Sequence, residues 1–267
     1  MRPLVSIIMP AFNAERFIGE AIISVLAQTY DNWELLIVND GSQDDTAAVI
    51  AAFTDPRIRV FHQENKGIGS ARNLALDHTR GSLLCGLDSD DMLPSDSLEC
   101  RVKVFEEEPR TDIVDGRVLF MDGELKNTVQ VFVPDYEGDP FPDLISFAGK
   151  SFMGFSWMVR WGPGYKERFP VDQTHGEDLL FYMQYANGKH YKAVDRTVLI
   201  YRRTGHSTMT NLRGLERSYI KIGQWLAASK RATTAELRTF LWKRKRIMVG
   251  SYWKAGQPLL AFRALFI

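Results

Sequence analysis

The sequence predicts an α/β protein whose first half is a doubly wound, mostly parallel sheet, and two observations support this prediction. Over the first hundred of the 267 residues, short apolar runs alternate with segments whose apolar residues recur at helical spacing. Each apolar run is followed by a polar turn, as expected where strands of such a sheet end. With 45% hydrophobic residues, the chain can bury the core of one large domain or of two closely packed ones.

Four strands are expected in this first half. They cover residues 5–9, 33–40, 58–63 and 82–88. After the first strand, Phe17, Ala21 and Val25 recur at the spacing of one helical face, and Asn13 is expected to cap that helix. A helix at residues 69–78 is expected to follow the third strand.

Two polar motifs predict further helix starts. Ser42 and Asp45, and later Asp96 and Glu99, have the spacing of a capping box. In such a box the first side chain and the acid three positions later each accept a hydrogen bond from the other residue's backbone N–H. Both motifs precede segments with apolar residues at helical spacing, so a helix is expected after each.

The pattern changes from about residue 110. Residues 111–121 and 127–134 are expected to pair as strands around a turn at Asp122–Gly123, followed by a loop rich in proline and acid at 135–143. A helix is expected to begin near Glu177 and a strand near Tyr191. Residues 213–267 have a helical pattern throughout, so the chain is expected to end in a helical extension.

Charge and cysteine content exclude several classes of protein. The 33 basic and 33 acidic residues cancel, which argues against nucleic acid as a partner. The two cysteines, Cys85 and Cys100, lack metal-finger spacing and fit a reducing compartment. The N-terminal apolar stretch is too short for a signal peptide, and no apolar run reaches 18 residues. A cytoplasmic protein is therefore expected.

Polar residues follow all four predicted strands, at the edge where parallel sheets bind ligands. They are residues 10–13, Asp40, residues 65–72 and residues 88–91. The DxD sequence at Asp88 and Asp90, with Asp91 beside it, concentrates carboxylates that suit Mg²⁺ or Mn²⁺ bound together with a substrate diphosphate. The alternative is that these acids only end a strand and start the next helix.

Three motifs in this order resemble family 2 glycosyltransferases, the inverting enzymes of the GT-A fold. They are SIIMPAFNAERFIGEAIISVLAQTYDNWELLIVNDGSQDDT, NKGIGSARNLAL and LDSDDML. The resemblance is dense over residues 4–100, extends through HGEDLLFYMQ and YRRTGHSTM, and is weak or absent in the last fifty residues. It implies a Rossmann-like mixed sheet flanked by helices. It also implies a nucleotide-sugar-binding half at 1–105, an acceptor-binding half at 106–212 and a C-terminal helical segment at 213–267.

The resemblance also implies roles for single residues in the first half. The expected nucleotide-binding residues are Pro10, Ala11, Asn13, Asp40, Asn65, Gly67, Arg72 and Asp88. Asp40 is expected to read the base edge, most often uracil in this family, and Arg72 to approach the base or a phosphate. Asp90 is expected to be the principal metal ligand, with Asp88 and Asp91 as further candidates.

In the second half the resemblance assigns the acid pair and a cationic clamp. Asp178 is expected to be the general base that takes the proton of the attacking hydroxyl, with Glu177 beside it bonding the acceptor or steadying the loop. Both acids could instead only favour the N-terminus of their helix. Arg202, Arg203 and His206 are expected to hold the diphosphate, and His206 is a further candidate metal ligand.

These assignments predict transfer of a sugar from a nucleoside-diphosphate sugar, UDP-linked, to a glycan or lipid-linked acceptor in cell-surface polysaccharide synthesis. Two alternatives are a GT-A-like domain that binds nucleotide without transferring sugar, and a sugar nucleotidyltransferase. The second needs a glycine-rich, basic loop after the first strand, and PAFNAERF is not such a loop.

Two aromatic-rich segments each allow two interpretations. Phe155, Trp157 and Trp161 can stack on a sugar ring, and for Trp157 packing in the core is at least as strongly indicated. The basic and aromatic segment at 241–267 suits either peripheral contact with the inner face of an anionic membrane or a helical pair packed on the catalytic domain. Of these two, packing on the catalytic domain is favoured, with the lysines in water.

Overall fold

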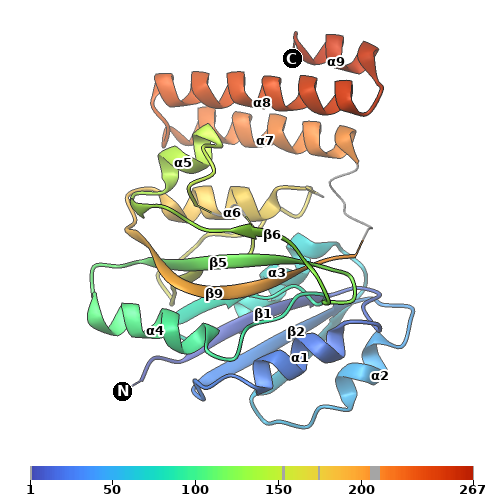
Figure 1. Cartoon of the computed structure of the whole chain (residues 1–267), viewed down its shortest axis with the longest axis vertical. Helices are drawn as coiled ribbons and strands as arrows, with labels where there is room; N and C mark the ends of the chain where they lie inside the picture. The colour runs from blue at the N-terminus through green and yellow to red at the C-terminus, as the bar shows by residue number, and fades with distance from the viewer. Residues whose placement is uncertain (1, 152–153, 174, 205–210, 267) are drawn as a thin grey trace.

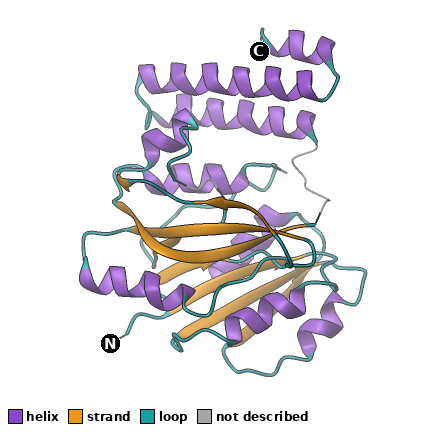
Figure 2. Cartoon of the chain, viewed as in Figure 1, coloured by secondary structure: helices purple, strands orange, loops and turns teal. Residues whose placement is uncertain are grey.

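The computed structural model describes residues 2–151, 154–173, 175–204 and 211–266. Within these residues the strands form one nine-stranded sheet, with helices on both of its faces (Figure 2). The strand order is β3-β2-β1-β4-β8-β5-β9-β7, and β6 pairs with β5 outside this path. The predicted α/β class, with a mixed sheet flanked by helices and a helical C-terminal extension, is confirmed.

The first half of the sheet is parallel, as predicted. It contains β1 (Val5–Ala11), β2 (Trp33–Asp40), β3 (Ile58–Gln63) and β4 (Leu83–Gly86). Val5, Ile7 and Met9 of β1 pack into one hydrophobic core, while Ile8 packs into another on the opposite face. A strand covered on both faces is apolar at nearly every position, which is why β1 and β2 could be predicted as continuous apolar runs.

The second half makes the sheet mixed. It contains β5 (Ile113–Asp122), β6 (Thr128–Phe132), β7 (Glu137–Gly138), β8 (Met158–Arg160) and β9 (Tyr191–Arg203). The strand β8 lies antiparallel between β4 and β5 and so joins the two halves, whereas β5 and β9 run parallel. The predicted antiparallel pairing of β5 with β6 is confirmed.

The helices surround this sheet in layers (Figure 1). They are α1 (Ile18–Leu26), α2 (Thr46–Ala51), α3 (Ile68–Asp77), α4 (Ser97–Glu107), α5 (Phe141–Ser146), α6 (Glu177–Ala186), α7 (Leu212–Ser229), α8 (Thr234–Lys254) and α9 (Pro258–Ala264). In Figure 1, α7, α8 and α9 stack as a separate layer at the top, and α1 and α2 lie at the bottom. None of the helices in the described part of the chain has the length and apolar character needed to cross a bilayer.

The predicted cap at Asn13 is wrong. The helix α1 begins only at Ile18, with Phe17 in the capping position. Asn13 has a positive φ of 49° instead, and its backbone N–H donates to the Ser42 hydroxyl at 3.0 Å. The Asn13 side chain accepts a hydrogen bond from the Gln43 backbone N–H instead of capping the helix.

Both predicted capping boxes are also wrong. Asp45 and Asp96 occupy the capping positions of α2 and α4, but neither side chain makes the capping hydrogen bond. Glu99 accepts a hydrogen bond from the Thr29 hydroxyl at 2.6 Å, so its carboxylate is used between elements. A capping box does occur at α8, where Thr233 and Glu236 bond each other's backbone.

Three short elements were not predicted: β7, β8 and α5. Each has two to six residues, so the sequence pattern of each is too short to show a period. Next to β8, the Trp157 ring is 1% exposed and stacks on Tyr182 with ring centroids 4.1 Å apart. Phe155 and Trp161 are buried as well, so all three aromatic residues pack in the core.

Candidate active site

Asp40 organises the loop between β3 and α3. Its carboxylate accepts hydrogen bonds from the backbone N–H groups of Lys66 at 2.8 Å and Gly67 at 2.9 Å. Gly41 has a positive φ of 73°, and a Cβ there would lie 2.7 Å from the Asn65 backbone nitrogen. The glycine therefore allows the two loops to meet. Three of the predicted nucleotide-binding residues, Asp40, Asn65 and Gly67, thus lie together, and Asp40 shapes the loop that carries the other two.

The end of β1 lies at the same edge. Pro10 and Ala11 are buried within the strand, and the exposed Asn13 accepts a hydrogen bond from the Gln43 backbone N–H at 2.9 Å. Between them Phe12 is 49% exposed. Phe12 is not among the predicted nucleotide-binding residues. Its position could have indicated a role, because Phe12 is an aromatic residue in the polar turn after a buried strand. A ring in such a turn can stack on a nucleotide base.

The three acids after β4 have different surroundings. The Asp88 carboxylate pairs with Arg72 at 2.8 Å. Asp91 is buried, and its carboxylate accepts a hydrogen bond from the Arg202 backbone N–H at 2.9 Å. For the Asp90 carboxylate, by contrast, no side chain of the described residues donates a hydrogen bond. Burial and the nearby Asp88 charge raise the pKa of Asp90 to about 6. Among the three acids, Asp90 is therefore the one whose carboxylate has no protein hydrogen-bond donor outside its own backbone in the described residues.

A divalent cation fits this loop only together with further ligands. The described residues contain no ready cluster of three or more His, Cys, Asp or Glu side chains that could hold a metal. An unpaired, partly buried carboxylate beside a second one is nevertheless the donor set that Mg²⁺ or Mn²⁺ uses when a substrate diphosphate and water complete the shell. Asp90 and Asp88 fit that mode, whereas the Asp91 side chain holds β9.

Arg72 connects the two halves of the molecule. It is 2% exposed, and its guanidinium bonds Asp88 at 2.8 Å and Glu177 at 2.9 Å. The face of the guanidinium lies 4.1 Å from the centroid of the Phe155 ring. Burial opposes the charge, but the two carboxylates more than offset it, so the pKa of Arg72 is raised. One buried cation thus places the loop after β4 next to the start of α6.

The Phe155 ring fits beneath Arg72 because residue 86 is glycine. A Cβ at Gly86 would lie 1.6 Å from a carbon of that ring. No rotation of a well-packed ring at this site relieves such an overlap, because cores are close-packed. Gly86, the last residue of β4, therefore allows the Phe155 ring to lie against the strand, with the Arg72 guanidinium over the ring.

Asp178 lies at the start of α6, beside this ion-pair cluster. The backbone and dipole of a helix N-terminus favour a charged carboxylate, which lowers its pKa. Here burial has the larger effect: together with the neighbouring charge of Glu177 it raises the pKa of Asp178 to about 7, although Arg72 acts in the opposite direction. A carboxylate that titrates near neutral pH is suited to accept a proton from a substrate.

This raised pKa predicts how stability depends on pH. An ordinary aspartate titrates near about 4, so the folded protein holds the Asp178 proton more tightly than the unfolded chain does. The free energy of unfolding is therefore expected to fall as the pH rises from about 4 through about 7. Asp178→Asn is expected to remove this loss and to raise stability at pH 8 by at least about 1 kcal/mol, the value of one pKa unit. Urea unfolding of both proteins at pH 5 and pH 8 measures it, and a smaller gain at pH 8 than at pH 5 would contradict it.

The structure describes two of the three residues predicted to hold the diphosphate, Arg202 and Arg203. The buried guanidinium of Arg202 donates to the carbonyls of Asp90 and Gly123, each at 2.9 Å, and pairs with Glu20. Arg202 thus holds the acidic loop against the turn after β5, and a direct contact with phosphate would require it to give up one of these bonds. Arg203 is exposed and donates to the Gln130 side chain at 2.8 Å. His206 lies outside the described residues.

Comparison with known proteins gives consistent matches. Residues 6–161, more than half of the chain, match the family model described as glycosyl transferase family 2. Over 102 residues the chain is 46% identical to the UDP-Glc:alpha-D-GlcNAc-diphosphoundecaprenol beta-1,3-glucosyltransferase WfgD of Escherichia coli, covering 38% of this chain and 40% of that protein. Over 198 residues it is 31% identical to an uncharacterized glycosyltransferase of Rickettsia felis, covering 72% of this chain and 32% of that protein. The matched part thus spans 32–40% of the length of these two curated relatives.

Solved structures share the fold over nearly the whole chain. The S. aureus TarS 1–349 structure in complex with UDP-GlcNAc has a TM-score of 0.67 at 15% identity, and the match covers 98% of this chain and 90% of that one. The mannosyltransferase PcManGT from Pyrobaculum calidifontis, in complex with GDP-Man and Mn²⁺, has a TM-score of 0.61 at 20% identity and covers 99% and 74%. At such low identities these likenesses show a common fold.

Proposed function

The chain belongs to glycosyl transferase family 2, and from that premise we propose that it transfers a sugar from a UDP-linked donor to a hydroxyl of a glycan or lipid-linked acceptor, with inversion. A relative with 46% identity is named for UDP-Glc and a diphosphoundecaprenol-linked acceptor, and a structural neighbour was solved with UDP-GlcNAc. Both support a UDP sugar as the donor and cell-surface polysaccharide synthesis as the pathway class.

The Arg72 bridge is the observation that carries this proposal. Through Asp88 and Glu177 it joins the predicted donor side of the site to the acid pair on the predicted acceptor side. In the proposed reaction the acceptor oxygen attacks the anomeric carbon from the face opposite the diphosphate. Asp178 takes the hydroxyl proton, the bond from the anomeric carbon to the diphosphate oxygen breaks, and UDP leaves with the electron pair. The donor half is assigned to residues 1–105, the acceptor half to 106–212 and the helical segment to 213–267.

Metal dependence is part of the proposal. Asp90 and Asp88 would hold Mn²⁺ or Mg²⁺, with Asp91 and His206 as further candidates. When bound, the ion would stabilise the negative charge that develops on the departing diphosphate. The structure of PcManGT in complex with GDP-Man and Mn²⁺, which shares the fold, supports a metal ion in the proposed reaction. Arg202 and Arg203 are the proposed cations near the diphosphate, with Arg202 also fixing the acidic loop.

We place the reaction on the cytoplasmic side of the membrane. Cys85 and Cys100 are both free thiols, which fits a reducing compartment. The acceptor would then be met at the inner face.

Donor turnover tests the proposed function. The chain is incubated with a panel of nucleotide sugars and Mn²⁺, thermal shift ranks binding, and release of UDP reports transfer or slow hydrolysis. Binding with UDP release is the expected result. Binding without turnover across donors and acceptors would instead favour a nucleotide-binding domain without transferase activity. Pyrophosphate release from UTP and a sugar phosphate would favour a nucleotidyltransferase.

Asp90→Asn is expected to abolish the linkage between Mn²⁺ and UDP binding. The variant removes the unpaired carboxylate, so Mn²⁺ should no longer increase the thermal stabilisation by UDP, and transfer should fall by roughly a hundredfold or more. Calorimetric titration of UDP with and without Mn²⁺ measures the linkage. Asp96→Asn, which changes an acid at the start of α4, is the matched control and should behave as wild type. Unchanged Mn²⁺ linkage in Asp90→Asn would remove Asp90 as the principal ligand.

A further inference from the structure

Charge is distributed unevenly along this neutral chain. Residues 231–267, which form α8 and α9, contain eight Lys and Arg residues and one acid, Glu236. The remaining 230 residues therefore hold 25 of the 33 basic and 32 of the 33 acidic residues. The molecule is thus polarised, with a positive helical layer at the top of Figure 1 and an excess of negative charge below it.

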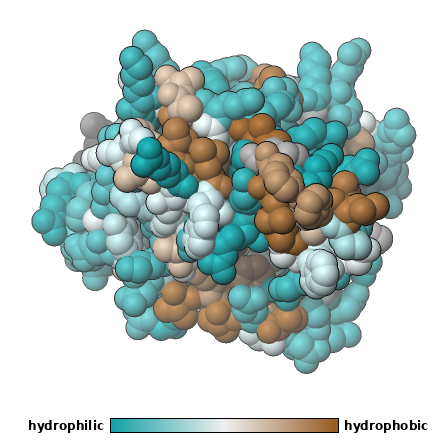
Figure 3. Space-filling view, turned by 90° about the horizontal axis from the view of Figure 1, so that it is seen from above, coloured by the Kyte–Doolittle hydropathy of each residue, from teal (hydrophilic) through white to brown (hydrophobic). Residues whose placement is uncertain are grey.

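The same layer exposes large apolar side chains. Leu259 is 85% exposed, Phe266 75% and Trp253 71%. We define the C-terminal patch as Trp242, Trp253, Leu259, Phe262, Leu265 and Phe266, all of them exposed. The Phe262 and Phe266 rings pack edge to face, 5.2 Å apart. Figure 3 looks down on this layer and shows hydrophobic residues gathered beside hydrophilic ones. A cluster of this kind usually marks an interaction site.

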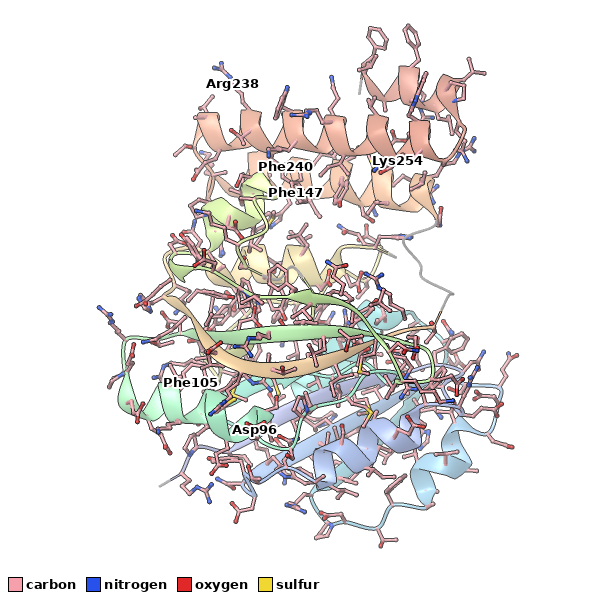
Figure 4. All side chains as sticks on the ribbon, in the orientation of Figure 1. Asp96, Phe105, Phe147, Arg238, Phe240 and Lys254 are labelled. Carbon is pink, nitrogen blue, oxygen red and sulfur yellow. The ribbon has the colours of Figure 1, made fainter. Side chains whose placement is uncertain are left out.

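Cations lie on the same face of α8 as its exposed tryptophans. Trp242, Arg246 and Trp253 are four and seven residues apart, so they share one helical face. The Arg246 guanidinium lies over the Trp242 ring, 4.6 Å from its centroid. Arg238 points away from the rest of the molecule at one end of α8 (Figure 4), and the exposed Lys254 is at the other end.

We infer that the C-terminal patch docks this protein on an anionic lipid bilayer. Aromatic and leucine side chains would enter the boundary between headgroups and acyl chains, and Arg238, Arg246 and Lys254 would meet the anionic headgroups. Tryptophan favours this boundary because its ring is apolar and its N–H is polar. At one end of the patch, a pocket of about 520 Å³ puts Arg213 beside Leu259 and Leu260, a pairing that suits a phospholipid with its phosphate and chain.

Charge argues for a bilayer over a second copy of the chain. In a symmetric dimer the same surface faces itself, so the basic layer of one protomer would oppose the basic layer of the other. An anionic bilayer complements the cations and accepts the apolar side chains at once.

Docking would also orient the active site. The N-terminal turn of α7 contacts the loop before α6, since a Cβ at Gly214 would lie 2.5 Å from the His175 ring. The helix α7 packs on α8 and α8 on α9, so the patch is connected to the site through packed helices. This orientation toward a lipid-linked acceptor rests on the proposed function, whereas the docking itself does not.

Vesicle sedimentation of the full chain tests the docking. Vesicles of phosphatidylcholine alone are compared with vesicles that also contain phosphatidylglycerol, at low and high salt. The chain is expected to sediment with the anionic vesicles and to be released as salt screens the charges. Arg238→Gln, Arg246→Gln and Lys254→Gln together should lower partitioning by about 100-fold, at roughly fivefold per cation. Removing three exposed cations elsewhere, at Arg2, Lys103 and Arg110, is the control and should have little effect.

A second variant tests the apolar side chains. Leu259→Ser, Phe262→Ser and Phe266→Ser together should lower partitioning by at least roughly tenfold even at low salt. The matched control is Val129→Ser, Val131→Ser and Val133→Ser, three similarly exposed apolar residues in and after β6, which should bind as wild type.

Three results would overturn the inference. In the first, the wild-type chain stays in the supernatant with both vesicle types. In the second, the serine variant still sediments with anionic vesicles. In the third, the wild-type chain is a dimer that does not bind vesicles, and the serine variant is a monomer. UDP binding by thermal shift is measured in parallel. A chain that binds vesicles but no UDP would contradict only the proposed function, and one that binds UDP but no vesicles only the docking.

Discussion

Asp178→Asn is expected to lower kcat for sugar transfer by about 10²- to 10⁴-fold while UDP and Mn²⁺ still bind, because general base catalysis contributes a factor of that size. The amide is nearly isosteric with the carboxylate but cannot take the acceptor proton. Only the step in which the hydroxyl attacks should suffer, so kcat and kcat/KM should fall together. Donor binding is checked by calorimetry and transfer by UDP release.

The dependence of the wild-type rate on pH belongs to the same prediction. The base must be unprotonated to act, and the pKa of Asp178 is raised to about 7. The rate is therefore expected to fall as the pH drops through about 7 and to level off above it. Asp172→Asn, which changes an exposed acid six residues earlier, is the control. Near wild-type transfer by Asp178→Asn would remove the base assignment.

Arg72→Met is expected to have the largest effect on stability. It leaves the buried Glu177 and the partly exposed Asp88 without their cation, and breaking the buried pair with Glu177 costs about 3–5 kcal/mol. Transfer should be lost as well, because nothing then holds the loop after β4 against α6. Urea unfolding measures the stability, and UDP release measures transfer.

Two further variants separate the role of this arginine from a general effect of losing one. Arg2→Met removes an exposed guanidinium that pairs with the exposed Asp31 at 2.8 Å, and should cost at most about 1 kcal/mol. Arg72→Lys keeps the charge but cannot bond both carboxylates in a fork, so the variant should fold but transfer sugar more slowly than wild type.

The Arg72 charge lowers the pKa of Asp178. In Arg72→Met protein that still folds, the acid limb of the profile of rate against pH should therefore shift to higher pH. A stable, fully active Arg72→Met protein would contradict the bridge.

The sequence was most informative where a strand ends in a polar turn. The predicted bounds of β2 and β3 agree residue for residue with the structure, because their ends coincide with polar turns. The strand β8 was not predicted. Its three residues form a strand because they pair with β4 and β5, and the sequence of three residues does not indicate such pairing. The capping boxes were predicted wrongly for a related reason, since short polar side chains bond whichever backbone or hydroxyl group the tertiary structure brings near.

The candidate site was predictable only in outline. Parallel strands bring their carboxyl ends to one edge, so the meeting of Asp40 with residues 65–67 follows from the strand order. The pairing of Arg72 with Glu177 depends on how the two halves pack, which spacing along the chain does not encode. The raised pKa of Asp178 likewise depends on burial that only the folded protein shows.

The contact between Gly86 and Phe155 has a consequence for related proteins. A side chain at position 86 would occupy the volume of the Phe155 ring, so residue 86 can enlarge only if residue 155 becomes smaller. Across an alignment of relatives the two positions should therefore covary, with alanine at 86 appearing only beside a smaller side chain at 155. In relatives with that exchange, the guanidinium corresponding to Arg72 has no aromatic ring beneath it. Its ion pairs with the acids corresponding to Asp88 and Glu177 should then be weaker.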